Sequence, residues 1–538
     1  MNPGKATGAF FVLAVFFRIA YIFLFPPAGT DHEMIHTAVD NLLSGNGLAF
    51  PIANPADLST TFYEPMNEWP PLVAYLLSVI KAMTGDGRAA DLILMSAGML
   101  LLLVVINSMM KVLKLKEQVQ VILWLIIAAN PEPFRNLGIS DLYSGLFLMW
   151  GVLFSLRLVQ QEFIKPSQIV IASIFFFLPA AFRYQYYPVI FMCPLFLIAA
   201  GRFLKNKHLF RNGINAFSIV FFLLVLQVVL LYQQTGIAAK MADVAGFYPE
   251  NLIWTYPFLL KGFINISYLE NGLIGYGHWT IIPYYIITFL FTIFLLYKLF
   301  FYLLHKMKEV EVTEYGVSNI IHLNRFFIFS VALSIVGLLI VLSVRYSPQM
   351  NYAGRFTYVH EGRYFVAATL LLLLLFAQLL QEEVSYSRIS VKQLRRVLVG
   401  SMMLINFALF GKFIYNIATD NLKGTREGWV AERKIVLNEI EELQKKYNLP
   451  VVAVASQKYF LYQPVMHEYG IIKSFTQLRQ MGIKTSHPLQ LLIITNKHPN
   501  KEELNFIKEK GAGEVYSGRA CKMYHMIIGN RQTLASLY

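Results

Sequence analysis

Residues 91–110 read DLILMSAGMLLLLVVINSMM, and their only charged side chain is that of the first residue, Asp91. About 20 apolar residues in a helix can cross the 30 Å core of a bilayer. Similar blocks recur along the 538 residues, which are 56% hydrophobic and only 14% charged, with a mean hydropathy of +0.51. Soluble domains carry about a quarter charged residues. The sequence therefore predicts an all-α polytopic membrane protein and argues against a soluble enzyme.

The apolar blocks predict eleven membrane spans. One further block, Pro70 to Gly85, is short and carries Lys81, so we expect it to lie in the interface as an amphipathic helix. The expected spans are residues 8–25, 91–110, 119–133, 138–157, 167–183, 186–201, 213–233, 279–303, 326–344, 364–381 and 397–416.

The basic loops predict the orientation of these spans, because Lys and Arg gather in short cytoplasmic loops. With Pro70 to Gly85 in the interface, one side receives Lys111, Lys114, Lys116, Arg202, Lys205, Lys207, Arg211, Lys298, Lys306, Lys308, Arg388, Lys392, Arg395 and Arg396. We therefore expect the N-terminus inside, the C-terminus outside, and a long first outer loop over residues 26–90. The net charge of +14 then reflects topology rather than nucleic-acid binding.

The tail has a different character from the rest of the chain. Its apolar runs VVAVAS (451–456), LQLLIIT (489–495) and KMYHMIIG (522–529) are typical of strands, and residues 500–511 are typical of a helix. This alternation predicts a small α/β domain on the outer side. The sequence thus divides into a transmembrane domain, 1–416, which includes the first outer loop, and an extracytoplasmic domain, 417–538.

Polar groups open the first outer loop, which begins GTDHEMIHTAVDNLL (29–43). Asp31 and Glu33 are candidate catalytic acids, although Asp31 is also suited to cap the helix that the next residues predict. His32, His36 and Asp40 follow at i, i+4 and i+8, so they share a helix face and could hold a divalent metal ion. Histidines on a wet helix face without a metal are the alternative interpretation.

Three further segments complete a pattern: TTFYEPMNEWPPLVAYLL (60–77), ANPEPFRNLGISDLYSGLFL (129–148) and HEGRYFVAATLLLLLLF (360–376). The sequence resembles the GT-C membrane glycosyltransferases that use polyprenyl-phosphate sugars. The resemblance rests on four features in order: an acidic motif after the first span, Pro-Pro-Leu opening an interfacial helix, an Asp at the start of a later span, and a late Arg-Tyr pair. Within them the layout is most similar to the protein O-mannosyltransferase and aminoarabinose transferase branch. His32 separates a commonly adjacent acidic pair, and Trp69 stands where His is frequent in the mannosyltransferases.

The resemblance implies a multi-pass enzyme of the inner membrane that transfers a sugar from a polyprenyl-phosphate donor, with inversion, to a glycan, lipid or protein acceptor. The implied catalytic residues are Asp31, Glu33 and Asp141. Arg363 and Tyr364 match the family's late Arg-Tyr motif, and Pro70 and Pro71 match its Pro-Pro pattern, so the resemblance implies that they bind substrate. Arg135 and Arg183 are further candidates for the donor phosphate, and anchoring at the membrane interface is the alternative interpretation of Arg183 and Arg363. Glu64 and Glu361 are reserve carboxylates for a metal ion or for sugar hydroxyls. A flippase or transporter for a lipid-linked sugar is the leading alternative, and a non-catalytic scaffold is a third.

Overall fold

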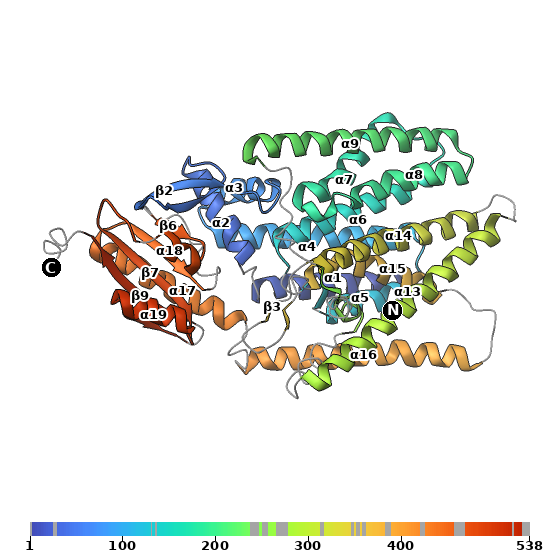
Figure 1. The fold of residues 1–538 in the computed structure, drawn as a ribbon. Helices are drawn as coiled ribbons and strands as arrows, with labels where there is room; N and C mark the ends of the chain where they lie inside the picture. The colour runs from blue at the N-terminus through green and yellow to red at the C-terminus, as the bar shows by residue number, and fades with distance from the viewer. Residues whose placement is uncertain are drawn as a thin grey trace. The chain divides into compact units, whose positions relative to one another are not determined.

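The computed structural model describes residues 3–24, 30–130, 132–134, 137–236, 247–249, 257–264, 278–311, 317–345, 349–350, 356–357, 362–381, 389–419, 426–456, 469–481, 483–518 and 521–529. The chain folds into two compact units (Figure 1). The helical unit contains Met1–Leu24, Glu68–Pro70 and Leu92–Tyr415, and the sheet unit contains Phe25–Asn67, Pro71–Asp91 and Asn416–Tyr538.

Every predicted span falls on a helix. The helices that carry the spans are α1 (Pro3–Leu24), α4 (Gly87–Val112), α5 (Glu117–Ala129), α6 (Ile139–Val159), α7 (Pro166–Phe182), α8 (Met192–Phe203), α9 (Lys207–Thr235), α13 (His278–Glu311), α14 (Val317–Arg345), α15 (Val366–Gln381) and α16 (Ile389–Ala418). Six of them, α1, α4, α6, α9, α13 and α14, are long and apolar enough to cross a membrane, and the rest contain shorter apolar stretches. The chain is therefore a multi-pass membrane protein.

Shorter elements of the helical unit connect these helices. They are α11 (Pro257–Lys261), the 3₁₀ turns η1 (Glu132–Phe134), η2 (Tyr184–Tyr186), η3 (Val189–Phe191) and η5 (Gly362–Phe365), and the strand pair β3 (Gln349–Met350) and β4 (Phe356–Thr357).

Glycines allow α8 and α9 to pack closely. A Cβ added at Gly201 would lie 2.3 Å from the backbone nitrogen of Phe210, and one at Gly213 would lie 2.6 Å from that of Ile198. Close approach through small residues is how helices associate in lipid, where burial of apolar side chains gives little driving force.

The sheet unit contains the predicted strands of the tail. Its elements are α2 (Thr30–Leu43), β1 (Ala49–Asn54), β2 (Asp57–Pro65), α3 (Leu72–Thr84), α17 (Arg426–Tyr447), β5 (Val451–Ala455), β6 (Tyr469–Ile472), α18 (Phe475–Met481), β7 (Leu489–Asn496), α19 (Lys501–Lys510), β8 (Gly513–Ser517) and β9 (Cys521–Ile528). Asn500 caps α19 by accepting from the backbone of Glu503, and Gly511 ends it at φ +69°.

The hairpin β1–β2, which lies between α2 and α3 in the sequence, belongs to the same sheet as the tail. The seven strands lie in the order β2-β1-β6-β5-β7-β9-β8. Strand β1 runs parallel to β6, with Ile52 opposite Ile471. Figure 1 labels β2, β6, β7 and β9 of this sheet. Beside this pairing, Asp57 accepts hydrogen bonds from the backbone and hydroxyl of Ser486. The sheet unit therefore contains residues from both sides of position 416, so one boundary at that position does not separate the two units. Strand pairing joins main-chain groups that can be far apart in the sequence.

Candidate functional site

Arg183 is the centre of a buried polar cluster in the helical unit. It ends α7, is 8% exposed, and donates from Nε to Asp141 Oδ1 at 2.7 Å and from Nη2 to the same oxygen. Its guanidinium also lies over the ring of Tyr364, 5.0 Å from the centroid. The structure thus brings together three predicted site residues from the start of α6, the end of α7 and η5.

The two carboxylate oxygens of Asp141 contact different groups. Its Oδ2 accepts from the backbone N–H of Gly138 at 3.3 Å, at the start of α6, while Oδ1 holds Arg183. Asp141 therefore contacts both a guanidinium and the start of a helix.

Several predicted residues lie at or beyond the limits of what the structure describes. Arg363 precedes Tyr364 within η5, but its side chain is not described, and Arg135 and Glu361 lie outside the described residues. Pro70 is buried, and Pro71 directly precedes α3, as the Pro-Pro pattern predicted.

Arg18, a buried arginine within the first predicted span, has a structural role. It is 1% exposed and donates to the carbonyl oxygens of Ala128 at 2.6 Å and Asn130 at 3.4 Å. These carbonyls end α5, where the helix dipole and open acceptors favour a cation. The sequence did not indicate this role, because its partners are main-chain atoms more than 100 residues away.

In the sheet unit, α2 carries the two acids of the first outer loop. The helix begins at Thr30, so Asp31 lies in its first turn. Glu33 forms an ion pair with Arg433 of α17, and both side chains are largely buried. Arg433 gave no signal in the sequence, since the pair joins residues 400 positions apart.

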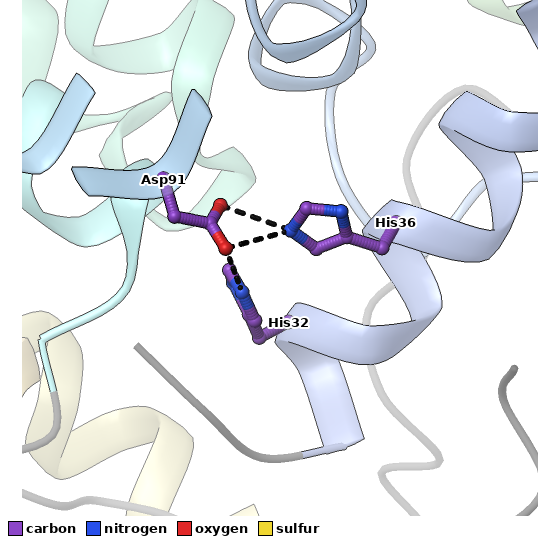
Figure 2. Close-up of side chains that lie close together, drawn as sticks. All are labelled: His32, His36 and Asp91. Carbon is purple, nitrogen blue, oxygen red and sulfur yellow. Dashed lines mark hydrogen bonds and ion pairs between the residues drawn. The ribbon is translucent and has the colours of Figure 1, made fainter. Parts of the chain in front are cut away.

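His32 and His36 point from one face of α2 at the same carboxylate, that of Asp91 near the start of α4 (Figure 2). His32 Nε2 lies 2.9 Å from Asp91 Oδ2, and His36 Nε2 lies 2.9 and 3.0 Å from the two oxygens. Burial lowers the pKa of His32, whereas the charge of Asp91 and its hydrogen bond raise it, and the net shift is upward.

The acid beside these histidines is thus Asp91 and not Asp40, which the sequence placed on the same helix face. Asp40 instead pairs with Lys81 of α3. Asp91 was not among the predicted site residues, although it stands as a lone acid at the start of an apolar block.

Glu64 lies on β2 and forms an ion pair with Lys473, which follows β6; both side chains are partly exposed. This pair is part of the contact between the first outer loop and the tail within the sheet.

Comparisons with known proteins identify the fold. No protein-family model and no curated protein sequence matches the chain. Its structure is similar to the crystal structures of ArnT from Cupriavidus metallidurans bound to undecaprenyl phosphate, with a TM-score of 0.55, and in the apo state, with a TM-score of 0.56. Each likeness covers 98% of both chains at 11% sequence identity. The chain therefore has an ArnT-like fold, which confirms the fold that the resemblance to the GT-C glycosyltransferases implied.

Proposed function

We propose that the protein is a membrane glycosyltransferase that transfers a sugar from a polyprenyl-phosphate donor to an acceptor at the outer face of the membrane. The observation that carries the proposal is the cluster of Asp141, Arg183 and Tyr364, in which separate motifs of the resemblance converge. The ArnT-like fold supports it, since one of those ArnT structures holds undecaprenyl phosphate.

The proposal assigns the donor phosphate to η5. Tyr364 is held by its stacking on Arg183, and Arg183 is held by Asp141, so the cluster fixes the turn in which Arg363 stands. A guanidinium offers paired N–H groups that match phosphate oxygens. Arg363 would stabilise the negative charge that the phosphate gains as it leaves.

The proposal assigns proton transfer to Asp31. The acceptor's hydroxyl or amine attacks the anomeric carbon, the bond from that carbon to the phosphate oxygen breaks, and the electron pair leaves with the phosphate. Asp31 takes the proton that the acceptor loses. Attack from the face opposite the phosphate inverts the anomeric carbon.

The test is donor recognition by the purified protein. Undecaprenyl phosphate should raise its melting temperature in detergent, whereas undecaprenol, which lacks the phosphate, should not. Arg363→Ala should remove most of the shift, and mass spectrometry of lipids that co-purify should find a polyprenyl-phosphate sugar. Equal responses to both lipids would refute the donor class, and donor binding without any sugar transfer would favour the flippase.

The orientation is tested by cysteine labelling. The two native cysteines, Cys193 and Cys521, are buried, so the background should be low. Ser59→Cys should react with a membrane-impermeant thiol reagent in intact spheroplasts, and Lys207→Cys only after permeabilisation. The reverse pattern would put the sheet unit in the cytoplasm and remove the outer-face site.

A further inference from the structure

We propose that His32, His36 and Asp91 form a binding site for a transition-metal dication, most suitably Zn²⁺. The site would tie α2, the helix that carries Asp31 and Glu33, to the first residues of α4 (Figure 2). This inference goes beyond the proposed function, because metal binding by these residues does not depend on which reaction the protein catalyses.

The geometry brings three ligand atoms to one point. His32 and His36 are four residues apart on α2, so their rings share a face of the helix. The ligand atoms of the two imidazoles and of Asp91 all lie within 4.8 Å of one another. In a tetrahedral site with bonds of about 2.0 to 2.2 Å, ligand atoms lie roughly 3.3 to 3.6 Å apart. Small side-chain rotations would therefore admit an ion.

The surroundings restrict how these side chains can move. The ring of His36 lies against Gly87, where an added Cβ would be 3.1 Å from two ring atoms. The side chains of His32 and Asp91 are 10% and 8% exposed, and that of His36 is 12% exposed. The cluster is thus largely closed by protein but still reaches solvent beside His36, which would let an ion enter and a water molecule complete its coordination.

The charge of the cluster favours a cation. Among the residues that the structure describes, two imidazoles lie within hydrogen-bonding distance of the Asp91 carboxylate, and neither is a permanent cation. A buried carboxylate without a compensating charge is costly. A protonated imidazole could compensate it, and a dication bound by two neutral imidazoles could do so as well. These two states are the competing accounts of the cluster.

The donor set indicates the kind of metal. Two imidazole nitrogens and one carboxylate oxygen suit zinc and its first-row neighbours, whereas magnesium and calcium prefer sites made of oxygen atoms. Three protein ligands with one remaining position form the open type of zinc site.

The experiment measures metal content rather than activity. The full-length protein, with its purification tag removed, is stripped with a chelator in detergent, equilibrated with Zn²⁺, desalted and analysed by elemental mass spectrometry. The wild type should retain about one zinc ion per chain. Asp91→Asn should weaken zinc binding by about 100-fold or more, since loss of even an outer-shell partner costs 10- to 100-fold.

Asp40→Asn is the matched control. Asp40 lies one turn beyond His36 on α2 but pairs with Lys81, so this variant should keep the zinc. If Asp91→Asn does not fold, His36→Gln provides the same test from the partly exposed side of the cluster, with His208→Gln on α9 as its control. Bound Co²⁺ should give the visible absorption of a tetrahedral nitrogen and oxygen site in the wild type and lose it in these cluster variants.

The outcomes separate the competing accounts. Zinc retained by the wild type and by Asp40→Asn but lost by the cluster variant supports the site. If the wild type binds no more zinc than Asp91→Asn, the metal site is overturned. The cluster would then be only a set of hydrogen bonds that joins α2 to the start of α4. Loss of zinc in Asp40→Asn to the same extent would also overturn it.

Discussion

Asp141 in the helical unit and Asp91 in the sheet unit are buried carboxylates near the start of apolar helices, but their partners differ. Asp141 holds the guanidinium of Arg183, which remains charged at any pH the protein meets. Asp91 holds two imidazoles, whose charge depends on the conditions. The negative charge of Asp141 is therefore always balanced by a guanidinium. The negative charge of Asp91 is balanced only when a proton or a metal ion is bound beside it.

This difference indicates what each cluster is suited to do. A permanently neutral pair is a fixed support, and in this protein it holds Tyr364 and the η5 turn. A carboxylate with titratable partners is suited to bind a cation. We therefore predict that both carboxylates support the fold around the site, and we keep the proposal that Asp31 is the general base.

The largest expected effect is that of Asp31→Asn on sugar transfer. Loss of a general base typically lowers the rate by 10²- to 10⁴-fold. Asp31 lies in the first turn of α2, where loss of its charge should lower the stability of the helix by about 1 kcal/mol or less. The transfer rate from a polyprenyl-phosphate sugar is compared with the wild type at equal expression and equal melting temperature. A rate within a few-fold of the wild type would show that Asp31 is not the general base, and another acid would then have to be considered.

The next effect tests the two carboxylates directly. Asp141→Asn leaves the buried guanidinium of Arg183 without its counter-charge, which typically costs about 3 to 5 kcal/mol. Asp91→Asn in metal-free protein should cost less, about 1 to 2 kcal/mol, because a histidine that loses its carboxylate can release its proton. Unfolding of both variants is measured in the same detergent and without metal. Equal losses of unfolding free energy in the two variants would show that an arginine partner and a histidine partner make no difference to the cost of losing the carboxylate.

Arg363→Lys tests whether the supported turn presents paired donors or a simple charge. Lys keeps the charge but loses the planar pair of N–H groups, and a hydrogen bond to a charged group contributes about 1.5 to 3 kcal/mol. We expect affinity for undecaprenyl phosphate to fall about tenfold or more. Arg202→Lys, in a basic loop, is the control. Unchanged affinity in Arg363→Lys would mean that this arginine is an interfacial anchor.

Much of the helical unit could be predicted from the sequence, because a span is encoded locally by a continuous apolar block. The block Pro70 to Gly85 was recognised as shorter, and it forms the 13-residue helix α3. The strands of the tail could also be predicted locally, because a short continuous apolar run is typical of a buried strand. Strands β5 and β7 are such runs, and almost all of their residues are buried.

The partners within each unit could not be predicted. The hairpin β1–β2 contains the unremarkable sequence AFPIAN, and only its pairing with β6 shows that it belongs to the sheet. Likewise, helical periodicity placed Asp40 on the face of His32 and His36, but Asp91 approaches from another element. Single residues of the site can be identified by their chemical type, whereas the ion pairs of Asp141 and Glu33 join segments 42 and 400 residues apart.

The smallest expected effect is that of Glu64→Gln, which extends the comparison to an exposed acid. Glu64 pairs with Lys473, but their side chains are 31% and 41% exposed, so water and salt already stabilise both charges. Exposed pairs typically contribute less than about 1 kcal/mol. We therefore expect Glu64→Gln to change the unfolding free energy by less than that and to leave sugar transfer unchanged, in contrast to Asp141→Asn. The melting temperature is measured at low and high salt, where the wild type and the variant should converge at high salt. A loss as large as that of Asp141→Asn would show that burial does not decide the cost, and a large fall in transfer would return Glu64 to the substrate-binding residues.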